Sequence, residues 1–174
     1  MIVRSLVTFR SDLADDGVET EDRKDFIEWP GRVHALVLSE ILQALDWRIS
    51  RMVDANEHGW ELEAGLGRKW IWAQVTPLDE VILMFKDMSP ERTWYFAKKP
   101  PGSVFTGMLT ALDAALQVDS RFHDVRWFTS KEYDFSAPGA PKPVSDILEM
   151  AGYVPPPPPP QRPWREWDHP WRDR

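Results

Sequence analysis

Residue types that could carry acid–base or metal chemistry are few and scattered along this sequence. The four histidines, His34, His58, His123 and His169, form no H-x-H or H-E-x-x-H spacing. His123 is followed by Asp124, the one local histidine–carboxylate pair, in an expected loop before a strand. A general base or a metal site needs further ligands or orienting groups, and none stands nearby in the sequence. We therefore predict no catalytic residue and no metal ligand.

Two other short patterns could carry chemistry, and both have a simpler structural interpretation. Glu61 and Glu63 stand two residues apart, which places a carboxylate pair on one face of a strand. Charges on a solvated strand face also discourage aggregation, and we favour that role for the pair. Gly65 and Gly67 resemble the opening of a dinucleotide fingerprint, but Trp70 occupies the third glycine position and the segment joins two expected strands. We predict no cofactor.

The charge of the chain is concentrated in one segment. The formal net charge is −7, and the stretch from Ser11 to Glu28 holds eight acidic and two basic residues, so it carries six of the seven negative charges. This balance argues against nucleic acid as a ligand, because phosphate binding needs a basic face. The segment is either a solvated loop or a steering patch for a basic partner protein. The acids that we expect to contact such a partner are Asp15, Asp16, Glu19, Glu21, Glu61 and Glu63.

The C-terminal residues 155–174 form a second unusual segment. Six consecutive prolines are followed by Trp164, Trp167 and Trp171. Proline runs act as stiff spacers, and tryptophan is enriched among the residues that anchor protein interfaces. Three arrangements stay open for this tail: it folds back onto its own sheet, it docks on another chain, or it is disordered in the free protein. We predict that the three tryptophans contribute to partner binding.

Hydrophobic periodicity outlines a domain of the α+β class. Short connections between the central strands imply antiparallel neighbours. We expect an antiparallel sheet of about five or six strands with two main helices on one face, and a Pro/Trp-rich tail. The expected elements are a strand over 2–9, an acidic loop over 11–30, a helix over 33–53, strands over 60–66, 70–75, 81–86 and 93–97, a helix capped by Ser103 and running to about 116, a strand over 125–128, and a turn or short helix over 129–133.

We expect the chain to consist of a single domain over 1–135, a linker over 136–154 and the tail over 155–174. A short helix is expected from Ser145 to Met150 within the linker. Three of the central strands, at 70–75, 81–86 and 93–97, are apolar on both faces, whereas a solvated antiparallel sheet alternates. We therefore expect both faces of the sheet to be covered.

Composition indicates an intracellular location. The chain contains no cysteine, no run of about 18 apolar residues and no apolar stretch that suits a signal peptide. We expect a cytoplasmic protein that does not contact a membrane.

The order of elements over 33–133 resembles that of small acidic bacterial proteins, uncharacterised or of toxin-immunity type. The resemblance is carried by the stretches EHGWELEA, KWIWAQV, VILMF and RFHDVRWFTSKEY. It implies a stoichiometric binding protein that works without a cofactor.

We expect a non-catalytic protein-binding protein, in its most specific form an immunity-type inhibitor of a basic toxin. A secretion or assembly chaperone is one alternative, and it predicts a homodimer with a hydrophobic groove. A small-molecule-binding or enzymatic domain without a recognisable motif is the other.

Overall fold

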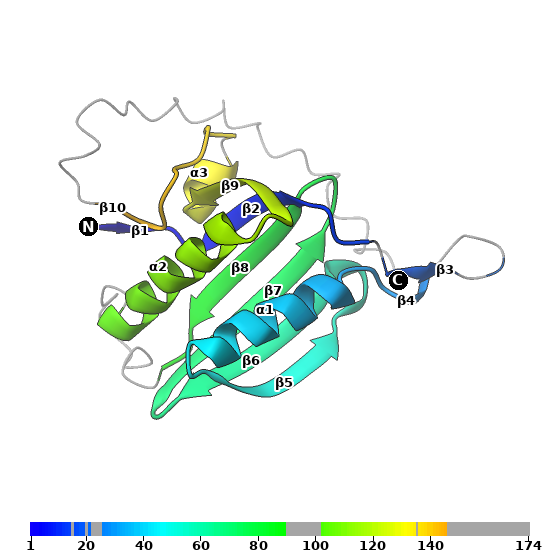
Figure 1. The fold of residues 1–174 in the computed structure, drawn as a ribbon, viewed down its shortest axis with the longest axis horizontal. Helices are drawn as coiled ribbons and strands as arrows, with labels where there is room; N and C mark the ends of the chain where they lie inside the picture. Colours follow the sequence, from blue (N-terminus) through cyan, green and yellow to red (C-terminus); the bar gives the residue numbers. More distant parts are fainter. Residues whose placement is uncertain (15, 20, 22–25, 90–101, 135, 146–174) are drawn as a thin grey trace, which may run out of the picture.

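The molecule is built on one six-stranded antiparallel sheet with two helices across it (Figure 1). The computed structural model describes residues 1–14, 16–19, 21, 26–89, 102–134 and 136–145. The strand order β5-β6-β7-β8-β2-β9 places the N-terminal β2 between β8 and β9. The predicted fold class is confirmed. The strands of this sheet are β2 (Leu6–Ser11), β5 (Arg48–Asp54), β6 (Trp60–Leu66), β7 (Lys69–Pro77), β8 (Val81–Asp87) and β9 (Phe122–Phe128).

Both main helices cover the same face of the sheet, as Figure 1 shows. They are α1 (Arg32–Ala44) and α2 (Ser103–Val118). Shorter elements surround this frame: the strand pairs β1 (Ile2–Val3) with β10 (Val144–Ser145) and β3 (Val18–Glu19) with β4 (Phe26–Glu28), the 3-10 turn η1 (Asn56–His58) and α3 (Ser130–Asp134).

The hydrophobic core lies between the helices and the sheet. Cross-strand registers place Leu62, Ala73 and Phe85 in one row on the helix-facing side, and all three are buried. Leucines of α1 and α2 fill the space above these rows. The alternation expected for the strand over 60–66 is confirmed, because Leu62 and Ala64 point into this core. Each buried methylene stabilises the fold by about 0.8 kcal/mol, so this apolar layer is the main source of stability.

The helix predicted over 33–53 is wrong beyond residue 44, because the chain turns back into strand β5. Asp46 adopts a left-handed backbone conformation with φ 65°. The N–H of Trp47 donates to the carbonyl of Leu42 at 2.9 Å, and that of Asp46 donates to Gln43 at 3.0 Å. This pair of hydrogen bonds is the Schellman motif that ends a helix. Buried Trp47 packs into the core just past the helix end.

The start of α2 also differs from the prediction. Gly102, with extended backbone angles, precedes the first helical residue, and no side-chain cap is present. Ser103 is therefore the first residue inside the helix rather than its cap. In the C-terminal part of the described chain, Ser145 belongs to β10, so the helix expected from this residue does not begin there. Residues 93–97 and 146–150 lie outside the described residues.

The segment 136–145 runs along the outer edge of β9 and reaches the sheet face opposite the helices at Phe128. Ala140 and Trp127 exchange two backbone hydrogen bonds of 2.8 Å at the outer edge of β9. Gly139 has φ 74°, and a Cβ there would lie 2.6 Å from the ring of Phe128, so a side chain cannot be accommodated. The residues expected to form a linker thus pack closely against the sheet.

A buried ion pair holds this cover in place. The guanidinium of Arg4 makes bidentate contacts of 2.9 Å with Glu132, and the side chains are only 3% and 12% exposed. Arg4 also donates through NH1 to the hydroxyl of Ser145. Burial opposes ionisation of Glu132, but hydrogen bonds from Arg4 and from Thr129 outweigh it, so the pKa of Glu132 is lowered.

Candidate interaction surface

The acidic segment forms an arm at one end of the molecule. Its strands β3 and β4 pair as a small hairpin, which Figure 1 shows projecting beyond the sheet. The rings of Phe26 and Trp29 lie 4.9 Å apart at its base. The carbonyl of Trp29 accepts a hydrogen bond of 3.1 Å from the indole N–H of Trp60 on β6. The segment expected as a loop is thus partly structured and attached to the sheet.

The side chain of Asp16 caps the helix that follows the arm. Its carboxylate accepts hydrogen bonds from the backbone N–H of Gly31 at 2.8 Å and from that of Val33 at 2.5 Å. These donors lie at the N-terminus of α1, on the cap residue Gly31 and in the first turn, where N–H groups have no intrahelical partner. A carboxylate there also complements the helix dipole. The side chain that we expected to contact a partner therefore positions α1 in the free protein.

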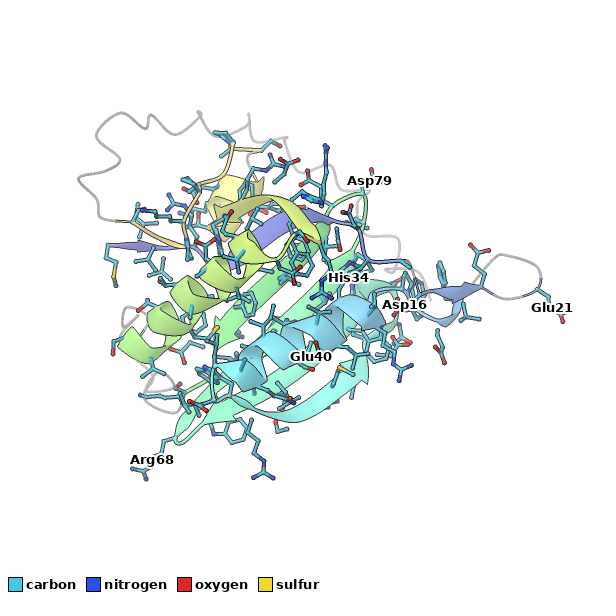
Figure 2. All side chains as sticks on the ribbon, in the orientation of Figure 1. Asp16, Glu21, His34, Glu40, Arg68 and Asp79 are labelled. Carbon is cyan, nitrogen blue, oxygen red and sulfur yellow. The ribbon has the colours of Figure 1, made fainter. Side chains whose placement is uncertain are left out.

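The other predicted acids of the arm lie farther out. Glu19 and Glu21 are exposed, and Figure 2 shows Glu21 at the outer end of the arm. Asp15 lies outside the described residues, as do Trp164, Trp167 and Trp171.

The structure brings Glu61 and Glu63 to the sheet face that α1 and α2 leave uncovered. Their cross-strand neighbours on β7 are Gln74 and Trp72, which fixes the face they share. Glu63 also lies 3.4 Å from Arg51 on the edge strand β5. This exposed ion pair was not expected, because residues 48–54 carry a helical apolar spacing in the sequence. Glu61 and Glu63 therefore border an apolar surface on this face of the sheet.

We call that surface the open-face patch: Trp70, Trp72, Ile82, Met84 and Met88. Gln74 and Met84 are cross-strand partners, so Met84 shares a face with Trp70 and Trp72. Trp70 is 41% exposed and Met84 is 40% exposed, although both lie on central strands. The N–H of Met88, itself 46% exposed, donates to the carbonyl of Trp70 at 2.8 Å. The expectation that both faces are covered holds at β2 and β9, but not over this patch within the described residues.

The histidines occupy separate surroundings. His123 Nε2 lies 2.9 Å from Asp12 on the neighbouring strand end, whereas the adjacent Asp124 pairs with Arg10 at 3.7 Å. Both pairs are exposed to solvent, so neither makes a desolvated base. Within the described part of the chain, no group of three or more histidine or acidic side chains could hold a metal ion.

His34 is the histidine with the most enclosed position. It lies on the first turn of α1 and borders a hollow of about 280 Å³, together with Ser11 and Asp79. Figure 2 shows both His34 and Asp79 at this end of the sheet. The hydroxyl of Ser11 accepts a hydrogen bond from the N–H of Leu13 at 3.1 Å, which ties it into a local turn.

Gly65 belongs to β6, and Gly67 with Arg68 forms the turn to β7, so this stretch joins two strands as expected. No helix of the described residues is both long enough and apolar enough to cross a bilayer. Comparisons of the chain with protein-family models, with curated proteins and with solved structures found no match.

Proposed function

We propose that this chain is a non-catalytic binding protein that docks another protein on its open-face patch. The observation that supports this proposal is the exposure of Trp70 and Met84, about 40% each, on central strands of the sheet. Tryptophan and methionine are enriched in protein interfaces, and methionine adapts to irregular partner surfaces. Exposed apolar groups that gather on one face, here around Lys86, are typical of interaction sites.

The acidic arm gives this docking surface a preferred kind of partner. Its segment carries most of the net negative charge of the chain, and Glu21 projects outward. Such a charge distribution attracts a basic protein and accelerates its encounter with the binding face. In the most specific form of the proposal, the partner is a basic toxin that this protein neutralises stoichiometrically.

The test compares two lysine substitutions at exposed apolar positions. A partner is captured from the native host on the full chain and identified, and its affinity is then measured for Met84→Lys and Val118→Lys. Val118 ends α2 and is 83% exposed, so it is a matched control away from the patch. We expect Met84→Lys to weaken binding about tenfold or more, because it places an unpaired charge in the interface centre. Equal affinities for the two variants would eliminate the proposed docking face.

The steering role of the arm is tested separately by kinetics. The double variant Glu19→Gln/Glu21→Gln should lower the association rate at low salt and leave the dissociation rate unchanged, because rim charges act mainly on encounter. The difference should vanish at high ionic strength. A basic partner that binds with a salt-independent rate would contradict steering. A homodimer of this chain with an unfolded client bound would instead favour the chaperone alternative.

A further inference from the structure

A second hollow, of about 610 Å³, lies at the opposite end of the sheet from the acidic arm. It is formed where the start of β5 faces the turn between β6 and β7, and its lining includes Arg48, Ile49, Gly65, Leu66 and Trp70. Its volume falls within the range of small-molecule sites, about 300–1,000 Å³. Apolar side chains and one guanidinium contribute to the same wall, so the hollow offers both contact area and charge.

Three of these residues form a row across neighbouring strands. Arg48 is the register partner of Gly65, and Gly65 is the partner of Trp70. Cross-strand partners share a face, so the side chains of Arg48 and Trp70 stand on the same side with a glycine between them. Two strand spacings separate their backbones by about 10 Å. The missing side chain at Gly65 lets the ring of Trp70 lie over the backbone of β6, toward the strand that carries Arg48.

The indole of Trp70 lies flat across that glycine. A Cβ on Gly65 would be 3.2 Å from three carbons of the six-membered ring, which places it above the ring face. One face of the indole is thus covered by the backbone of β6. The residue is still 41% exposed, so its ring offers a stacking surface. Aromatic rings stack in offset or edge-to-face arrangements that add to the stability from area burial.

The charge around this hollow is opposite to that of the whole chain. Arg48 is exposed and forms no ion pair with any residue of the described chain, although Asp46 also borders the hollow. Arg68 follows in the β6–β7 turn, and Figure 2 shows it at the far end from Glu21. Among the described residues here, Arg48 and Arg68 outnumber Asp46, which makes this end of an acidic protein locally attractive to anions.

From these observations we propose that the hollow binds a planar aromatic anion. The aromatic ring stacks on the exposed face of Trp70, and its acidic group, a carboxylate or a phosphate, takes a charge-assisted hydrogen bond from Arg48. The site shares Trp70 with the open-face patch but differs from it in chemistry, because it depends on the cation of Arg48. It does not depend on the proposed protein partner.

The test is a titration of the full chain with 2-naphthoate, followed by ¹H–¹⁵N correlation spectra. We expect saturable shifts of the Gly65 and Gly67 amides and of the Trp70 indole N–H. Arg48→Gln should weaken binding about tenfold, as expected for the loss of a charge-assisted hydrogen bond. Arg48→Lys should restore part of the affinity. The neutral probe 2-naphthylmethanol should bind weakly and be unaffected by Arg48→Gln.

The matched control is Arg68→Gln, which removes a neighbouring charge outside the lining of the hollow. It should change the affinity less than twofold, and the spectra of all variants should confirm that the fold is retained. Shifts that do not saturate, shifts confined to other parts of the molecule, or equal losses in Arg48→Gln and Arg68→Gln would each overturn the site. A loss of partner binding in Met84→Lys has no bearing on this result, so the two proposals fail separately.

Discussion

The buried contact between Arg4 and Glu132 is the residue-level feature with the largest expected effect on stability. A bidentate ion pair with this little exposure leaves a buried cation when its acidic partner is removed. Thr129 and Glu132 also exchange hydrogen bonds of 2.7 and 3.2 Å in a capping box that begins α3. One carboxylate therefore joins the N-terminal segment to α3 and to the cover over β9.

Replacing Glu132 by glutamine should lower the free energy of unfolding by about 3 kcal/mol, measured by urea denaturation. The matched control is Glu63→Gln, which breaks the exposed pair with Arg51 and should cost less than about 1 kcal/mol. Similar costs for the two variants would show that the buried pair does not hold the cover.

The same carboxylate predicts a pH dependence. The pKa of Glu132 in the folded protein lies below its ordinary value of 4.5, so the unfolded chain binds its proton more readily. The stabilisation is therefore complete above about pH 4.5 and is lost as the pH falls through the lower, folded-state pKa. Acid titration of stability should show a smaller loss over this window in Glu132→Gln than in the natural sequence. If the loss of stability at acid pH were the same in both proteins, other carboxylates would dominate that loss.

The elements show which sequence patterns were sufficient and which were not. Strands β6, β7 and β8 were predicted nearly to the residue, because alternation and short turns leave one antiparallel solution. The helix end was missed because apolar residues continue at helical spacing through Ile49, Met52 and Val53, and because the residue in the left-handed position is Asp46 rather than glycine. The strand pairing of β2 with β8 and β9 depends on tertiary packing that no local pattern encodes.

The helix end yields a direct prediction. Asp46→Gly should raise the free energy of unfolding by about 0.5–1 kcal/mol, since glycine adopts the left-handed conformation of the Schellman motif without steric cost. Gly→Ala at the freely exposed turn position Gly67, with φ 60°, is the converse control and should destabilise by a similar amount. Destabilisation by Asp46→Gly would imply that the aspartate side chain itself supports the turn.

The capping contact of Asp16 is the second prediction at this scale. Asp16→Ala should lower stability by about 1 kcal/mol, because two N–H groups at the start of α1 lose their acceptor. Amide exchange of Gly31 and Val33 should rise in parallel. Glu21→Gln, on the same arm, is the control and should change neither quantity. The sequence could not reveal this contact, since capping residues are normally adjacent to the helix and Asp16 lies 15 residues before Gly31.

The whole molecule is one sheet with its two main helices on one face, and its charges are separated along the sheet. Helices cover one face of the sheet (Figure 1). On the other face the segment 136–145 lies against Phe128, and the open-face patch lies on β7, β8 and Met88. The sequence pattern predicted that these strands are apolar on both faces, but not which part of the second face is covered. The acidic arm and the cationic β6–β7 turn lie at opposite ends (Figure 2). This asymmetry is what lets one small domain present two chemically different surfaces.

Oxidative footprinting of the complex with the captured partner tests the central claim most directly. Hydroxyl radicals label exposed methionine and tryptophan side chains, so Met84, Met88 and Trp70 report on the open-face patch in the free protein and in the complex. We predict strong protection of these three residues on binding and none of Leu78 or Val118, which are exposed elsewhere. Full labelling of the patch in a saturated complex would contradict it.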